Sequence, residues 1–185
     1  MKNFKILFLL LSVSLFGLAS CEESSDAGEY GNWQERNIAY IDSIATVARN
    51  NSDGKWKRFL AVGLDENKEH GNEYYVYCKE LQPGDGTEHP YYTDIVSVNY
   101  RGSLINDFVF DSSYDGELEP DFDVPVTFQL SGTVSGFSLA LQHMVKGDTW
   151  RVYIPAGLGY GTQESSGIPA NSTLIFDINL VSFQR

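Results

Sequence analysis

From Tyr75 to the C-terminus, the sequence is a series of short segments rich in β-branched and aromatic residues, separated by turn formers such as Pro83-Gly-Asp-Gly86. One segment breaks this pattern, because Phe137, Leu141 and Met144 share one face of a helix. Strands are predicted over 75–81, 95–100, 108–111, 126–130, 150–154 and 174–181, and a short helix over 138–144. Such a succession predicts an α+β domain, with an antiparallel β-sheet curved around one short helix.

A second helix is predicted upstream, because Ile38 and Ile41 begin an apolar stripe at helical spacing. Asn32-Trp-Gln-Glu35 has the form of a capping box with Asn32 as N-cap, and the helix should end near 50–54. The narrow stripe could serve as a dimerisation arm or pack on the chain's own domain, and the second alternative is favoured. The apolar cluster over 56–62 remains unassigned.

The first twenty residues have the pattern of a signal peptide: Lys2 and Lys5 precede a short apolar run that is too short for a transmembrane helix. Leu18-Ala-Ser-Cys21 resembles the bacterial lipobox, which predicts acylation of Cys21 and a lipid anchor in the membrane. Plain secretion with cleavage near Ser20 is the alternative. The inferred organisation is a signal peptide over 1–20, an acidic tether over 21–31, a helical extension and linker over 32–72, and the main domain over 73–185.

Charge limits the classes of partner. The chain has 13 basic and 25 acidic residues, a net charge of −12. Removal of the leader, with its two lysines and no acid, leaves 11 basic residues and a net charge of −14. This surface should repel nucleic acid and anionic lipid headgroups, so we predict no nucleic-acid partner and attachment through acyl chains.

The remaining chemistry-bearing residues do not form a standard reactive set. Cys78 would be the only thiol left after acylation, and its place in an alternating segment favours a small buried residue over a reactive one. His70, His89 and His143 are scattered and lack metal-ligand spacing. We therefore predict no metal and no cofactor, and an activity that needs no covalent intermediate.

An ordered set of motifs covers the chain from about Tyr75 onward. The motifs are Val98-Asn-Tyr-Arg-Gly102, Phe108-Val-Phe-Asp-Ser-Ser113, Met144-Val-Lys-Gly147, Val152-Tyr-Ile-Pro155, Leu158-Gly-Tyr-Gly161 and the segment from Ile168 to Leu180. Each is weak alone, but together and in this order they resemble FKBP-type peptidyl-prolyl cis-trans isomerases. The leader and acidic tether resemble those of bacterial lipoproteins, including the Bacteroidetes surface-export form.

The resemblance implies an apolar pocket that holds a twisted X-Pro amide. Tyr100, Phe110 and Phe176 would form its walls and Phe137 its floor. Asp111 would be a buried carboxylate beside the isomerising amide, satisfied by a hydroxyl such as that of Tyr100. The Val134 N–H and the Tyr160 hydroxyl would donate to substrate carbonyls. Val126, Thr133 and Ile168 would line the rim and bind substrate.

Partners and location follow from the same resemblance. It implies proline-containing polypeptides as substrates, macrolide immunosuppressants as possible ligands, and folding of envelope proteins as the role. The location would be the bacterial cell envelope, lipid-anchored in the outer membrane and facing the periplasm or the surface.

The sequence also departs from the family pattern. Phe137 stands where the family commonly has Trp, and no basic residue follows Phe110-Asp-Ser-Ser113. The segment 115–124 is longer than usual, and the loop 162–167 is short. Two functional classes therefore remain: an isomerase, which is favoured, and a binding module with little or no catalysis.

Overall fold

The computed structural model describes residues 28–119 and 122–185. The predicted signal peptide, Cys21 and most of the predicted tether lie outside these residues. Residues 32–185 form one compact unit. Among the described residues, no helix has the length and apolar character needed to cross a membrane.

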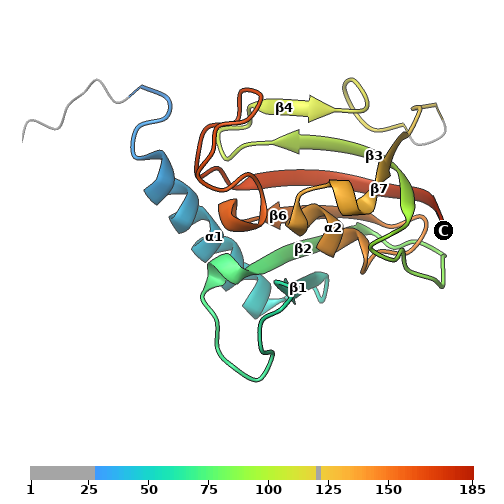
Figure 1. Cartoon of the computed structure of the whole chain (residues 1–185), viewed down its shortest axis with the longest axis horizontal. Helices are drawn as coiled ribbons and strands as arrows, with labels where there is room; N and C mark the ends of the chain where they lie inside the picture. The colour runs from blue at the N-terminus through green and yellow to red at the C-terminus, as the bar shows by residue number, and fades with distance from the viewer. Residues whose placement is uncertain (1–27, 120–121) are drawn as a thin grey trace, which may run out of the picture. The chain divides into compact units, whose positions relative to one another are not determined.

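A seven-stranded antiparallel sheet forms the centre of this unit (Figure 1). Its strands are β1 (Trp56–Leu60), β2 (Tyr75–Gln82), β3 (Ile95–Ser103), β4 (Val109–Ser112), β5 (Val126–Gln129), β6 (Thr149–Ile154) and β7 (Leu174–Gln184). The strand order is β1-β2-β6-β7-β3-β4, and β5 pairs with the other end of β3. The α+β antiparallel fold is confirmed, although β3 and β7 run several residues beyond their predicted ends.

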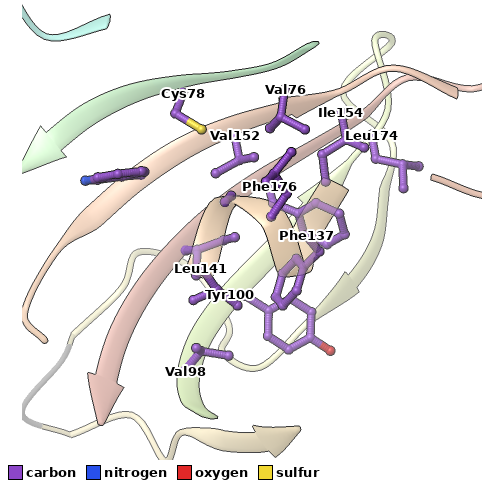
Figure 2. Packing of buried hydrophobic residues seen from close by; sticks show 14 of the residues in the cluster. Val76, Cys78, Val98, Tyr100, Phe137, Leu141, Val152, Ile154, Leu174 and Phe176 are labelled. Atoms are coloured by element: carbon purple, nitrogen blue, oxygen red, sulfur yellow. The ribbon is translucent and has the colours of Figure 1, made fainter. Parts of the chain in front are cut away.

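The short helix α2 (Ser135–Leu141) covers one face of the sheet. The helix begins and ends three residues earlier than predicted, and Met144 lies in the turn that follows it. Along β2, Val76 and Cys78 point toward α2, as does Val152 on β6 (Figure 2). These side chains alternate with outward-facing neighbours, as a pleated strand requires. The main core therefore lies between α2 and one face of the sheet.

Cys78 is fully buried in this core. Burial raises the pKa of its thiol far above the ordinary range, so the reactive thiolate is not populated at neutral pH. Cys78 is therefore a small core residue, as the alternating pattern indicated.

The opposite face of the sheet is covered by α1 (Trp33–Asn50). Ile41 and Ala45 of α1 pack on Tyr77 of β2 and Tyr153 of β6, which are the outward-facing residues of those strands. The helix packs on its own domain, which was the favoured alternative. Three 3₁₀ turns complete the fold: η1 (Asn72–Tyr74), η2 (Leu130–Gly132) and η3 (Ala156–Leu158).

The capping-box prediction at the start of α1 is wrong. Asn32 is the N-cap residue, but its backbone is left-handed (φ 48°, ψ 35°) and its side chain makes no capping hydrogen bond. A side-chain cap requires an extended backbone at this position, so Asn32 cannot aim its amide at the first turn.

The helix is instead fixed by buried hydrogen bonds to the segment just before β7. The Asn37 side chain accepts from the Thr173 backbone N–H at 2.7 Å, and the Trp33 indole donates to the Ser172 hydroxyl at 2.8 Å. The unassigned cluster that follows α1 forms β1, which pairs with β2 along its whole length. The sheet therefore begins before residue 73, where the sequence placed the start of the main domain.

Candidate functional site

One cleft of about 230 Å³ lies at the N-terminal end of α2, over the inner face of β3 and β7. Its lining is mostly aromatic, with a single charged side chain. The residues that line it are Tyr100, Asp111, Phe128, Gly132, Thr133, Val134, Phe137, Tyr160 and Phe176. A second cavity of about 130 Å³ lies between α1 and η3 and has no aromatic side chain in its lining.

Phe137 of α2 is the central ring of the cleft (Figure 2). It is 5% exposed, and its ring centroid lies 5.1 Å from that of Phe176, 6.1 Å from Phe128 and 6.3 Å from Tyr100. All three contacts are edge-to-face, the arrangement that aromatic pairs favour. The rings of β3, β5, β7 and α2 therefore support one another around an apolar hollow.

Strand alternation and a glycine set the position of the walls. Tyr100 and Phe176 both point inward, and Phe176 pairs directly with Gly102 of β3. A Cβ atom at Gly102 would lie 2.5 Å from the Phe110 ring and 2.7 Å from the Phe176 ring. The missing side chain therefore leaves the room in which Phe110 packs edge-on against Phe176 at 5.5 Å.

The polar centre of the cleft is a hydrogen bond of 2.6 Å, in which the Tyr100 hydroxyl donates to Asp111 Oδ2. Burial raises the pKa of Tyr100, and the bond to Asp111 raises it further, so the hydroxyl stays protonated as a donor. The expected hydroxyl partner of Asp111 is thus confirmed. The expected burial is wrong: Asp111 lies on the short strand β4 at the sheet edge and is exposed to solvent.

Two donors at the cleft have no partner among the described residues. The backbone N–H of Val134, the residue before α2, makes no hydrogen bond there, and neither does the Tyr160 hydroxyl. Tyr160 is 41% exposed and follows η3 in the loop toward β7. Both groups can therefore donate to a bound molecule without breaking a bond inside the protein.

Three of the expected site residues do not line the cleft. Phe110 contacts the Phe176 ring but is not among the residues that line the cleft. Ile168 is 3% exposed and belongs to the core, whereas Val126, at the start of β5, is 38% exposed. The other seven are brought together there: Tyr100, Asp111, Thr133, Val134, Phe137, Tyr160 and Phe176.

Phe128 and Gly132 line the cleft and were missed by the sequence analysis. Phe128 could have been found from the strand pattern, because it lies two residues after Val126 and shares its face of β5. Its ring contacts Tyr100 at 5.5 Å and Phe137 at 6.1 Å. No comparable signal marked Gly132, which lies in the 3₁₀ turn η2.

No group of three possible metal ligands exists within 28–119 and 122–185. The three histidines have separate local roles. His70 contacts the Asp65 carbonyl, His89 contacts the Met144 carbonyl, and His143 stacks on Phe59 at 3.9 Å.

Comparisons with known proteins identify the family that this chain resembles. A family model described as FKBP-type peptidyl-prolyl cis-trans isomerase matches residues 86–181. The chain is 43% identical over 108 residues to the peptidyl-prolyl cis-trans isomerase Mip of Coxiella burnetii, covering 58% of this chain and 44% of that protein. It is 41% identical over 108 residues to the outer membrane protein MIP of Legionella longbeachae, covering 58% of this chain and 43% of that protein. The chain thus spans under half the length of these relatives.

Solved structures show the same likeness. The crystal structure of a peptidyl-prolyl cis-trans isomerase from Pseudomonas syringae aligns with a TM-score of 0.59 at 27% identity, covering 82% of this chain and 96% of that one. The crystal structure of FkpA from Escherichia coli aligns with a TM-score of 0.55 at 27% identity, covering 83% of this chain and 63% of that one.

Proposed function

This chain belongs to the family of FKBP-type peptidyl-prolyl cis-trans isomerases, and from that premise we propose that its aromatic cleft isomerises X-Pro bonds in polypeptides. The observation that carries the proposal is the combination of an aromatic cleft, in which three rings pack against Phe137, with unpartnered donors on Val134 and Tyr160. Such a site is apolar enough to take a proline ring and polar enough to fix the peptide on either side of it.

The reaction needs no covalent step. The barrier to rotation is about 18–20 kcal/mol, because the twisted amide loses its resonance. During rotation the carbonyl group and the nitrogen lose their conjugation. A site that excludes water and fits the twisted amide therefore lowers the barrier. Phe137 would support the proline ring from below, with Tyr100 and Phe176 beside it.

The polar groups would hold the peptide while the bond turns. The Val134 N–H and the Tyr160 hydroxyl would each donate to a peptide carbonyl, fixing the chain on either side of the proline ring. Asp111, held by Tyr100, would face the twisted amide with a carboxylate oxygen. Thr133 would contact the bound peptide at the rim.

Isomerisation of a short proline peptide, measured alongside proline-limited refolding of a protein, tests the proposal. Tyr160→Phe keeps the ring and removes one donor, so we expect kcat/KM to fall about 2–10-fold, the value of one neutral hydrogen bond. Tyr74→Phe, which removes an exposed hydroxyl that does not line the cleft, is the matched control and should retain full activity. Wild-type protein without activity in either assay would contradict the enzyme proposal.

A binding module is the second candidate. The exposure of Asp111 favours it, because an exposed carboxylate polarises a twisted amide less than a buried one. A macrolide immunosuppressant would be a ligand in either case. Tight macrolide or proline-peptide binding without turnover would select this second function.

We further propose a bacterial cell-envelope location with a lipid anchor at Cys21. The relative from Legionella longbeachae is named as an outer membrane protein, and Leu18-Ala-Ser-Cys21 has lipobox form. Cys21→Ala should abolish incorporation of labelled fatty acid and release the protein from the membrane fraction. Full membrane retention of this variant without label would refute the lipid anchor.

A further inference from the structure

Among the residues that the structure describes, Asp111 is the only charged side chain that lines the aromatic cleft. Its Oδ2 accepts a hydrogen bond from the Tyr100 hydroxyl. Because this hydroxyl is neutral, the bond does not cancel the negative charge of the carboxylate. The five ion pairs among residues 28–119 and 122–185 do not include Asp111. The cleft therefore carries a solvent-exposed negative charge that the protein does not neutralise.

The causes of the raised pKa of Tyr100 are in line with this arrangement. Its pKa is raised by burial, by Asp111 and by Tyr160, and no cation opposes these effects. On the other face of the sheet, Arg151 lowers the pKa of Tyr153 against the effect of burial. A cation thus influences Tyr153 on the outer face, whereas none influences Tyr100 in the cleft.

The nearest arginine along the strand is directed away from the cleft. Arg101 follows Tyr100 in β3, so its side chain leaves the opposite face of the sheet. There Arg101 Nη1 donates to the Gly116 carbonyl at 2.9 Å, and its side chain lines a separate cavity with Arg151 and Asp177. The fold therefore separates the positive charge of β3 from the carboxylate of β4.

We propose that Asp111 makes this cleft selective for basic polypeptide segments, with Lys or Arg beside the isomerising proline preferred over Asp or Glu. The inference rests on the proposed function, and it names Asp111 as a specificity-determining residue. A substrate cation beside the proline would meet an unpaired carboxylate, whereas a substrate carboxylate would be repelled by it.

The expected size follows from Coulomb's law. At ~6–8 Å in a water-exposed site, one unit charge changes kcat/KM about 3-fold, so a Lys peptide should exceed a Glu peptide about 10-fold. At ~1 M salt the screening length is about 3 Å, and the ratio should approach one.

The experiment compares acetyl-Ala-X-Pro-Phe-amide peptides with X as Lys, Leu or Glu, at low and high salt. Asp111→Asn should reduce the Lys-to-Glu ratio to about one, whatever it does to the absolute rate. Asp65→Asn removes the same charge from an exposed loop between β1 and β2, so its ratio should match that of the wild type. Thr133→Lys keeps Asp111 and adds a cation at the cleft, so it should lower the ratio through a second route.

The outcomes separate the two proposals. Turnover of the Leu peptide with equal rates for Lys and Glu would overturn the charge preference and leave the isomerase function standing. A preference that Asp65→Asn reduces as much as Asp111→Asn would assign it to overall charge and overturn the role of Asp111. Absence of turnover for all three peptides would overturn the isomerase function, and the binding affinities of the same peptides would then decide the charge preference.

Discussion

The Tyr100 hydroxyl lies 2.6 Å from Asp111 Oδ2, so a side-chain hydrogen bond joins β3 to β4 inside the cleft. The backbones of these strands already pair, with Gly102 opposite Asp111. The side-chain bond fixes the carboxylate relative to the aromatic walls. It also keeps the phenol protonated, which links the geometry of the site to pH.

We expect stability to fall at alkaline pH. Because the pKa of Tyr100 is raised above the ordinary value of about 10, the stability from its protonated form is complete below pH ~10. This stability is lost as the pH rises toward the raised folded-state pKa. Melting temperatures should therefore be level from pH 7 to 9 and decline above 10. The decline should be shallower in Tyr100→Phe. Part of the decline should remain in this variant because of Tyr77, whose pKa burial raises to about 12. Parallel curves for the variant and wild type would contradict this assignment.

Asn37→Ala should destabilise the protein by about 1–3 kcal/mol. Asn37 is 2% exposed, accepts from the Thr173 N–H and donates to the Trp33 carbonyl at 2.7 Å. The substitution leaves a buried N–H without a partner between α1 and β7. Chemical denaturation measures the change, and the exposed Asn50→Ala at the end of α1 is the control. An equal effect of the two substitutions would mean that α1 is not held through Asn37.

Gly102→Ala should damage both stability and activity. The new methyl group would lie within 2.7 Å of the Phe110 and Phe176 rings, and overpacking of this kind costs about 1–3 kcal/mol. Gly157→Ala makes the same chemical change where no atom lies within 4 Å of the new group, so it should be tolerated. Thermal melts with isomerase assays would test the pair, and unchanged activity in folded Gly102→Ala would argue that the wall geometry is unimportant.

Phe137→Trp should raise affinity for a proline peptide or a macrolide. The indole adds apolar area and an N–H beneath the proline ring, and the 230 Å³ cleft above Phe137 offers room for it. The expected gain is a few-fold in Kd, offset where the larger ring strains the edge contacts with Phe128 and Phe176. Isothermal titration measures it, because Trp33, Trp56 and Trp150 complicate fluorescence. Weaker binding by a well-folded variant would show that the floor has no spare room.

The central strands could be predicted because each carries its own alternating pattern, but β1 could not. In Trp56-Lys-Arg-Phe-Leu60, Lys57 and Arg58 are consecutive, whereas an alternating strand would have an apolar residue at one of these two positions. In the fold, Lys57 Nζ lies 4.8 Å from the centre of the Trp150 ring, and Arg58 lies 4.8 Å from that of Tyr75. The cations lie over aromatic rings of two other strands, β6 and β2, so the local pattern of β1 could not predict this arrangement.

The site shows the same division between local and distant information. Tyr100, Phe137 and Phe176 follow from motifs and strand parity. The exposure of Asp111 depends on which segments cover β4, and the position of Val126 depends on where β5 begins relative to the cleft. Both are set by the packing of distant segments, so Asp111 is more exposed, and Val126 lies farther from the cleft, than the local pattern predicts.

Strand β7 is the last along the described chain, yet it lies between β6 and β3 in the sheet. The two halves of the sheet are joined only through it, so no N-terminal portion of the chain can assemble the fold. A chain leaving a ribosome or a translocon with its N-terminus first must keep its apolar strands open until residues 174–184 emerge. Loss of these residues by truncation should therefore abolish folding outright, and a proposed folding helper must itself avoid aggregation until its synthesis is nearly finished.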